Sequence, residues 1–343
     1  MTHAAIEHLG SRFVRATVIT SGEIAARNQF KNKFVELLVG DHPLPGARSL
    51  ESTRKLIEHA RSIPKDHKVM VLISGGTSAM LCGTESSEAL DQLVTQTDQL
   101  MRSGATIHEL NAMRSKLDPI KLGGLARHLG HLKTEQISVY LLGDVIESGE
   151  SRVESVIGSG PMWSSGIEHT IIGDNHTALD ALCALLASEG IGLAFIKRRA
   201  TGFASDEGIE LAQALLASDD QAPCAVCLGG EPTVRVGDQP GIGGPMLELA
   251  ARAAVELRGA AFPWTVISLA TDGADGPSGV AGAVLTHDML RAPDATERLR
   301  TAIEHHDTLG ICDQLGATIR TGHTGTNVND LALAIRWPGN TQV

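Results

Sequence analysis

Short apolar runs followed by glycine-rich loops recur along the chain and predict an α/β protein. The clearest run is Val69–Ile73, whose five successive apolar residues are typical of a strand covered on both faces of a parallel sheet. Ile137–Leu142 and Trp264–Leu269 are further predicted strands. Apolar residues three or four positions apart predict helices at 49–60 and 246–257. The alternation of strands and helices therefore favours sheets with helical layers.

A polar segment that ends in proline, 217–223, predicts a boundary between two domains. We expect an N-terminal α/β domain at 1–220 and a C-terminal α/β domain at 221–343. A chain of 343 residues is long enough to form two hydrophobic cores.

The charge balance excludes some classes of partner. Lys and Arg total 29 against 40 for Asp and Glu, which gives a net charge of −11. A nucleic acid or an anionic membrane surface would require a basic face, so we expect neither partner. No apolar run approaches the roughly 20 residues of a membrane helix, and the first residues lack the pattern of a secretory signal.

The five cysteines are an odd number without the spacing of a disulfide framework. A reduced, cytoplasmic protein is therefore expected. Cys224 and Cys227 form a lone C-x-x-C inside an apolar run, which favours buried thiols over a metal or redox site.

The turn after the strand Val69–Ile73 is the first candidate binding site. Its residues are Ser74, Gly75, Gly76, Thr77 and Ser78. The glycines allow positive φ, and bare N–H groups at a strand end suit a phosphate or a carboxylate. The hydroxyls of Thr77 and Ser78 could donate to an oxyanion or cap the following helix. An ordinary tight turn between strand and helix is the alternative.

A set of basic residues follows in the next predicted helix and loop. Asn111 and Arg114 are three positions apart and so share a helix face, and Lys121 follows near two glycines. These residues could bind an anionic ligand, or they could complement the end of their own helix. Asp144 follows the strand Ile137–Leu142 and is expected to face the ligand crevice of a parallel sheet.

Three loops in the C-terminal half are dense in polar groups. Asp272 and Asp275 follow the strand Trp264–Leu269 and could hold Mg²⁺, although paired Asx turns are an alternative. Gly230 and Glu231 lie between predicted strands at 225–228 and 233–236. The third loop suits a polar substrate or a nucleotide, and its candidate residues are Gly325, Thr326, Asn327, Asn329 and Asp330.

Taken together and in this order, four motifs resemble the type II glycerate kinases, whose C-terminal half is the MOFRL domain. They are Ser74–Ala79, Glu109–Arg114, Thr271–Pro277 and Thr324–Asp330. Shorter matches begin at His42, Gly143, Ser159 and Gly229, and the resemblance extends from about residue 16 to residue 335.

The resemblance implies ATP- and Mg²⁺-dependent phosphorylation of D-glycerate, or a close sugar acid, to 2-phosphoglycerate. It also implies mainly parallel sheets and an active-site cleft between two α/β domains. Asp144, Asp272, Lys121 and Arg114 would be catalytic, Asp272 and Asp275 would bind Mg²⁺, and the remaining candidates would bind sugar acid or ATP. The oligomeric state stays open, a homodimer included.

Two departures from the family pattern support alternatives. Family members open with Gly-Ala-Gly-Lys-Ala, whose lysine is a catalytic candidate, and this sequence begins after that segment. Pro245-Met246-Leu247 replaces the usual Arg-Asn-Gln. One alternative is thus an impaired relative that only binds a sugar acid or nucleotide. Another is a hydroxypyruvate reductase, but Gly241-Ile-Gly-Gly-Pro-Met lacks the third glycine of a dinucleotide fingerprint.

Overall fold

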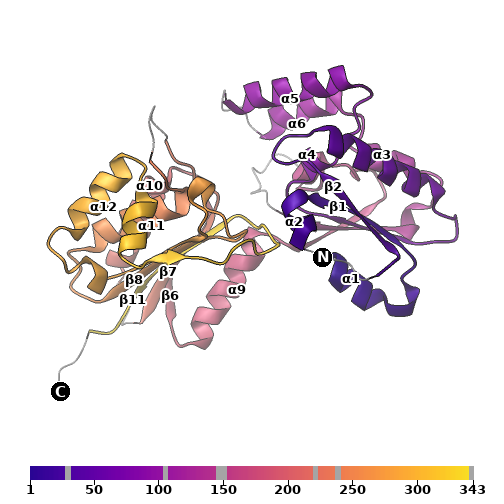
Figure 1. Ribbon diagram of the computed structural model, residues 1–343. Coiled ribbons are helices and arrows are strands. Elements are labelled where there is room, and N and C mark those ends of the chain that lie inside the picture. Colours follow the sequence, from indigo (N-terminus) through magenta and orange to yellow (C-terminus); the bar gives the residue numbers. More distant parts are fainter. Residues whose placement is uncertain (28–31, 103–106, 144–152, 219–222, 236–240, 340–343) are drawn as a thin grey trace. The chain divides into compact units, whose positions relative to one another are not determined.

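The computed structural model describes residues 1–27, 32–102, 107–143, 153–218, 223–235 and 241–339 (Figure 1). The chain divides into two compact units, Met1–Ile172 and Gly173–Val343. Each unit has its own hydrophobic core, so the chain folds as two α/β domains.

Unit 1 contains two small sheets. β1 (Ala16–Ser21) pairs in parallel with β2 (Val35–Gly40), and β3 (Val69–Ile73) pairs in parallel with β4 (Ile137–Leu142). β5 (Glu168–Gly173) completes the second sheet in the order β3-β4-β5. The parallel strands are connected by helical segments, as the predicted pattern requires.

The helices of unit 1 cover these strands with apolar faces. Leu56 and Ile57 of α3 pack on a core that includes Ile73 of β3 and Leu141 of β4. The helices are α1 (Thr2–Leu9), α2 (Gly22–Arg27), α3 (Ala47–Ser62), α4 (Thr77–Met80), α5 (Ser87–Arg102), α6 (Ile107–Leu117), α7 (Gly124–His128) and α8 (Val153–Val156). Short 3₁₀ turns lie at Gly10–Arg12, Thr134–Gln136 and Ile157–Ser159.

Unit 2 is built on a six-stranded sheet in the order β10-β9-β8-β11-β7-β6. The strands are β6 (Gly192–Ala200), β7 (Cys224–Gly230), β8 (Trp264–Ala270), β9 (Gly282–Thr286), β10 (Thr318–Ile319) and β11 (Asp330–Arg336). β6 and β7 are parallel, whereas β11 is antiparallel to both β7 and β8, and β9 is antiparallel to β8 and β10. The α/β class is confirmed, and the sheet of unit 2 is mixed because β11 inserts between two strands of the opposite direction.

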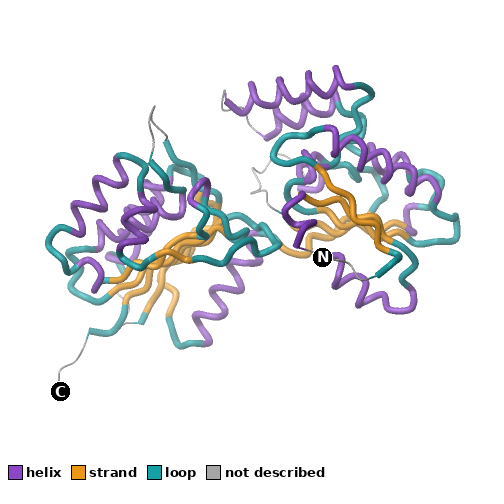
Figure 2. Tube along the Cα trace, in the orientation of Figure 1, coloured by secondary structure: helices purple, strands orange, loops and turns teal. Residues whose placement is uncertain are grey.

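Helices cover both faces of this sheet (Figure 2). α9 (Asn175–Ser188) packs on one face, where Ala225 and Cys227 point, and α10 (Ala204–Leu216), α11 (Pro245–Leu257) and α12 (Ala295–Glu304) pack on the other. α13 (Thr308–Gln314) joins the second layer, and 3₁₀ turns lie at Gly276–Ser278 and Asp288–Leu290. Because β7 is buried on both faces, the thiols of Cys224 and Cys227 are core groups, and all five cysteines are free and buried.

The division between the units lies upstream of the predicted boundary at 217–223. β6 pairs with β7, and α10 packs in the same core as α11, so the segment from Gly173 to Leu216 belongs to the C-terminal unit. Residues 219–222 of the predicted linker lie outside the described residues. Among the helices that the structure describes, none is long and apolar enough to span a membrane.

Candidate functional site

The turn between β3 and α4 has the geometry that its glycines predict. Gly76 adopts φ 79° and precedes the first residue of α4. The Thr77 hydroxyl donates to the Ser74 carbonyl oxygen over 2.7 Å, which closes the turn. A side chain at Gly76 would meet the His42 ring at 3.1 Å, so the close approach of these loops also requires glycine. The N–H groups of Gly75 and Gly76 make no hydrogen bond to another described residue.

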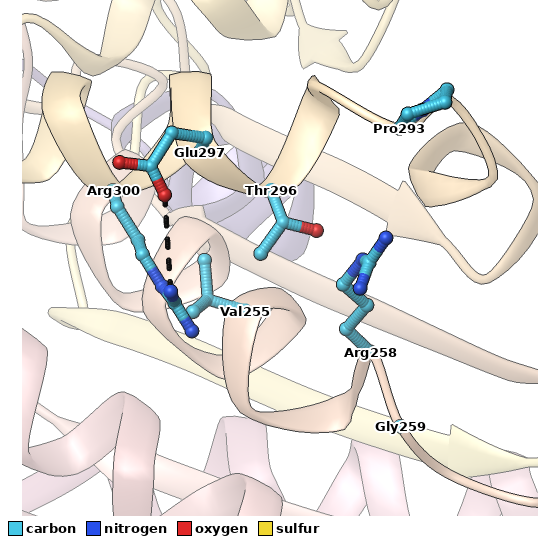
Figure 3. Close-up of a pocket in the computed structure, with 7 residues that line it drawn as sticks. All are labelled: Val255, Arg258, Gly259, Pro293, Thr296, Glu297 and Arg300. Atoms are coloured by element: carbon cyan, nitrogen blue, oxygen red, sulfur yellow. Dashed lines mark ion pairs between the residues drawn. The ribbon is translucent and has the colours of Figure 1, made fainter.

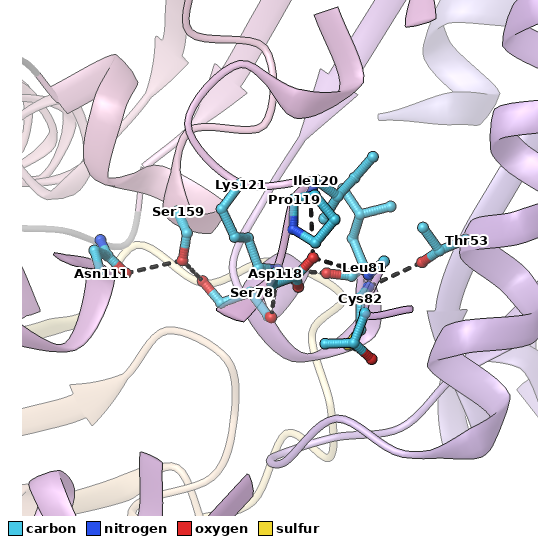
Figure 4. A network of polar contacts seen from close by, with 12 residues as sticks. Thr53, Ser78, Leu81, Cys82, Asn111, Asp118, Pro119, Ile120, Lys121 and Ser159 are labelled. Atoms are coloured by element: carbon cyan, nitrogen blue, oxygen red, sulfur yellow. Dashed lines mark hydrogen bonds and ion pairs between the residues drawn. The ribbon is translucent and has the colours of Figure 1, made fainter. Parts of the chain in front are cut away.

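A chain of polar side chains runs inward from this turn (Figure 4). The hydroxyl oxygens of Ser78 and Ser159 lie 3.0 Å apart, and the Ser159 hydroxyl donates to Asn111 Oδ1 over 2.8 Å. Asn111 Nδ2 donates to the Val156 carbonyl oxygen over 3.3 Å. Ser159 and Asn111 are buried, whereas Ser78 is only half-buried. The structure thus brings together two predicted residues, Ser78 and Asn111, through Ser159.

Ser159 was not among the predicted site residues. It has a positive φ of 63°, and both glycines beside it also have positive φ. A serine in the left-handed region is unusual and is often found where surrounding contacts enforce it. The Gly-Ser-Gly sequence at 158–160 is the signal that could have indicated this turn.

Lys121 is buried beside the same turn, where it contacts main-chain carbonyls and Asp118. Its ammonium donates to the Ser78 carbonyl oxygen over 2.8 Å and to that of Leu81, and lies 3.4 Å from Asp118 Oδ2. The side chains of Lys121 and Asp118 are both 0% exposed. Asp118 Oδ1 accepts from the N–H of Gly83 over 2.9 Å. Burial lowers the pKa of Lys121, and the carboxylate of Asp118 opposes that shift.

A lysine that neutralises a phosphate is expected to be accessible to the ligand, whereas the ammonium of Lys121 is buried. Its donors are directed to main-chain carbonyls and to Asp118, so it fixes the shape of the turn. The next residues extend the same bridge, because Leu122 N–H donates to Ser159 O over 3.0 Å and Gly123 N–H to Gly160 O over 2.8 Å. Lys121 therefore connects the turn at Ser78 with the turn at Ser159.

The structure gives fewer contacts for two further predicted residues of unit 1, Arg114 and Asp144. Arg114 is half-buried on α6, and burial lowers the pKa of its guanidinium. Asp144 lies outside the described residues. Catalytic roles for both residues stay predictions.

In unit 2 the candidate loops meet at one edge of the sheet. Asp330, the first residue of β11, pairs with Gly230 at the end of β7 and with Ala270 at the end of β8. Because β11 is antiparallel to its neighbours, its start lies beside their ends, and Glu231 and Asp272 follow directly. Predicted residues from three separate loops are thus adjacent.

The loop before β11 is held by main-chain contacts to this edge. Thr271 Oγ1 donates to Asn329 O over 2.7 Å and accepts from Val328 N–H over 2.9 Å. Asn327 Oδ1 accepts from Asn329 N–H over 2.9 Å, and Asn329 adopts φ 62°. Gly325 and Thr326 are exposed at the tip of this loop. The amide side chain of Asn327 thus shapes its own loop.

Asp330 has the most perturbed carboxyl group at this edge. Burial and the nearby charges of Asp275, Glu231 and Asp272 raise its pKa to about 8. These surroundings favour the protonated form of the Asp330 carboxyl more than they would for an exposed aspartate.

Asp275 is a helix-capping residue in this structure. Its carboxylate oxygens accept from Met246 N–H over 2.9 Å and from Leu247 N–H over 2.8 Å, in the first turn of α11. Its side chain is buried, and burial raises its pKa to about 6 although these N–H groups oppose the shift. A side chain at Gly244 would come within 2.3 Å of the Asp275 carboxyl carbon, so glycine is needed for this approach.

The predicted Mg²⁺ pair makes backbone contacts at both residues. Each oxygen of Asp275 accepts one backbone N–H, which leaves a lone pair on each oxygen, so a metal role for Asp275 stays a prediction. One oxygen of Asp272 itself accepts from Ala274 N–H over 2.9 Å, as an Asx turn requires. No group of three acidic, histidine or cysteine side chains in the described part of the chain could hold a metal. A metal role for Asp272 stays a prediction.

A cavity of about 330 Å³ lies between the end of α11 and the start of α12 (Figure 3). Its lining includes Arg258, Thr296 and Arg300, and no predicted site residue. It lies at the opposite end of α11 from Asp275, so it is separate from the edge that carries the acidic residues.

Family models match both units of the chain. The model described as a domain of unknown function, DUF4147, matches residues 1–179, and the MOFRL family model matches residues 224–330. The chain is 26% identical to the D-glycerate 2-kinase of Thermotoga maritima, over 98% of this chain and 87% of the relative. It is 29% identical to the human glycerate kinase, over 98% of this chain and 82% of that protein.

Solved structures agree with this similarity. The crystal structure of glycerate kinase from Thermotoga maritima matches with a TM-score of 0.85 and 26% identity, over 97% of this chain and 87% of that chain. A protein from Pyrococcus horikoshii has the same fold, with a TM-score of 0.74 at 22% identity over 95% of this chain and 89% of that chain. With a DUF4147 domain over more than half of its length and a MOFRL domain after it, the chain belongs to the glycerate kinase family.

Proposed function

We propose that this protein transfers a phosphoryl group from ATP to D-glycerate, or to a close sugar acid, and forms 2-phosphoglycerate with Mg²⁺ as the metal ion. The observation that carries the proposal is the similarity to D-glycerate 2-kinase over 98% of the chain. The predicted polar motifs support it, because those of each unit are adjacent in the fold.

Phosphoryl transfer depends mainly on the positioning of reactants and on neutralisation of charge. In the proposed mechanism, the turn from Ser74 to Ser78 binds the sugar acid, and Arg114 neutralises an anionic group. The protonated carboxyl of Asp330 can donate a hydrogen bond to a phosphate oxygen or to a hydroxyl. Asp144 and Asp272 are the proposed carboxylates for a proton or for a metal ion. Mg²⁺ would offset phosphate charge when bound.

The loop of unit 2 with Asn327 and Gly325 is proposed to bind polar groups of ATP or of the acid, together with Gly230 and Glu231. A cytoplasmic location and a homodimer also stay part of the proposal. Light scattering in solution would show whether the protein is a homodimer.

The decisive experiment supplies ATP, Mg²⁺ and D-glycerate and follows the product by ³¹P NMR, which distinguishes 2-phosphoglycerate from 3-phosphoglycerate. We expect 2-phosphoglycerate, and a fall in kcat on the order of 100-fold in Asp272→Asn. Asp288→Asn is the matched control, because its side chain is 73% exposed and it lies in the turn after β9, outside the candidate loops. If the wild-type protein forms no phosphorylated product, the proposal is wrong.

A second candidate is a relative that binds ligands without turnover. Met246 and Leu247, which stand where the family usually has polar residues, are buried in the core of unit 2 and offer only their N–H groups to Asp275. The polar side chains expected there are therefore replaced by packing groups. Calorimetry with ADP and with D-glycerate, each with Mg²⁺, would find binding without product if this candidate is correct.

A further inference from the structure

We propose that Ser78 meets its ligand as a hydrogen-bond acceptor, so that unit 1 selects a ligand that carries a hydroxyl group at this point. The inference rests on the proposed function only in naming that ligand as a hydroxy acid. The direction of the hydrogen bonds follows from the chain that links Ser78, Ser159 and Asn111 (Figure 4).

The orientation of the Asn111 amide sets the direction of the chain. A backbone carbonyl can only accept, so the atom of Asn111 that lies 3.3 Å from Val156 O must be the NH₂ group. The carbonyl oxygen of the amide then faces Ser159, 2.8 Å away. That oxygen can only accept, and it therefore takes the proton of the Ser159 hydroxyl.

Ser159 has one proton, and the bond to Asn111 uses it. The 3.0 Å contact between Ser159 and Ser78 can then be a hydrogen bond only if Ser78 donates. The reverse direction would leave the buried Asn111 oxygen without a donor among the described residues, at a cost larger than the gain of one ordinary hydrogen bond.

Of the three hydrogen-bonded residues Ser78, Ser159 and Asn111, Ser78 alone is not buried. It is therefore the residue that a ligand can reach. Its proton is directed to Ser159, which leaves lone pairs for the ligand. Its position is fixed because Lys121 donates to its carbonyl oxygen over 2.8 Å. An ionised oxygen of a carboxylate or of another oxyanion has no proton to offer and is repelled there, whereas an alcohol donates. This reverses the sequence-based expectation that the Ser78 hydroxyl donates to an oxyanion.

Neutron diffraction from a deuterated crystal of the full chain tests the direction without any ligand. We expect the deuterium of Ser78 to point to Ser159 Oγ, and that of Ser159 to point to Asn111 Oδ1. Deuterium on Ser159 directed to Ser78 would overturn the inference. This result is independent of whether the protein is a kinase.

Calorimetry tests the consequence for selectivity. D-glycerate is compared with D-lactate, which lacks the 3-hydroxyl, and with 3-hydroxypropionate, which lacks the 2-hydroxyl. In the wild type, we expect one of the two deoxy acids to bind about ten-fold more weakly than D-glycerate. In Ser78→Ala, D-glycerate should weaken to the same extent, and that deoxy acid should lose nothing further.

Sulfate, an oxyanion without a proton at neutral pH, distinguishes the two directions of the Ser78 hydrogen bond. If Ser78 is an acceptor, Ser78→Ala leaves the Kd for sulfate unchanged or lowers it. Weaker sulfate binding in that variant, by the factor found for D-glycerate, would contradict the inference. Ser62→Ala is the matched control, because the Ser62 hydroxyl is exposed and donates only to the His59 carbonyl of its own helix. If no hydroxy acid binds the wild type, the proposed function fails, and the neutron structure alone decides the direction.

Discussion

The polar network around Lys121 in unit 1 and the acidic residues Asp275 and Asp330 in unit 2 hold charge in opposite ways. In unit 1, the ammonium of Lys121 and the carboxylate of Asp118 are fully buried as a pair. In unit 2, Asp275 and Asp330 are acidic groups for which the described residues offer no ion pair. Asp275 is stabilised by the N–H groups of α11, and the surroundings of Asp330 favour its protonated form. The paired charges fix a turn, whereas the unpaired carboxyls make the other edge sensitive to pH.

The largest effect is expected from breaking the pair in unit 1. Lys121→Met leaves Asp118 buried without its cation and removes donors from the carbonyl oxygens of Ser78 and Leu81. We expect the free energy of unfolding to fall by about 3–5 kcal/mol in urea denaturation. Lys116→Met, an exposed lysine on α6, is the control and should change little. A loss below about 1 kcal/mol in Lys121→Met would show that the pair does not stabilise the unit.

An intermediate effect is expected where Asp275 meets α11. Gly244→Ala places a methyl group within 2.3 Å of the Asp275 carboxyl carbon, so the carboxylate must move away from Met246 and Leu247 N–H. A loss of about 1–3 kcal/mol follows, measured by the same urea titration. Gly259→Ala is the comparison, because nothing lies within 4 Å of its added methyl group. Equal losses in both variants would contradict a capping role for Asp275.

The effect that is smallest within any single pH unit is a dependence of stability on pH to which Asp330 contributes. The pKa of Asp330 is raised from 3.8 to about 8, so between about pH 4 and pH 8 the folded state binds more protons than the unfolded state. The free energy of unfolding should therefore fall as pH rises through this window, by at most about 1.4 kcal/mol per pH unit. Asp330→Asn should flatten the slope, whereas Asp288→Asn should not. An unchanged slope in Asp330→Asn would assign it to another group.

Strands that are buried on both faces were predictable from apolar runs alone. Val69–Ile73 and Ile137–Leu142 form β3 and β4 with the predicted bounds. The strand expected at 233–236 was wrong for its described residues, where only an isolated bridge at Thr233 is found. Pro232 directly before it removes a backbone donor, which disfavours continued pairing. β9 (Gly282–Thr286) was missed because it is short and follows a loop without a clear periodicity.

The sequence predicted which residues lie in the candidate site better than it predicted what each of them does there. Ser78, Asn111 and Asp330 were expected. Ser78 and Asn111 both contact Ser159, which was not predicted, and Asp330 pairs with the predicted Gly230. Lys121 was expected to face a ligand, but a lysine next to glycines gives no sign that Asp118 and two carbonyls will enclose it. Such roles depend on residues far apart in sequence, as Ser78 and Ser159 are.

The position of β11 has a consequence for how the protein is made. This strand is the last of those that the structure describes, yet it lies between β7 and β8 and pairs with both along its length. During synthesis, β7 and β8 therefore leave the ribosome before β11 does. The backbone groups of β7 and β8 that pair with β11 have no strand partner until residues 330–336 emerge. All strands of unit 1 are complete long before that moment. During synthesis, unit 2 thus has incomplete strand pairing for longer than unit 1.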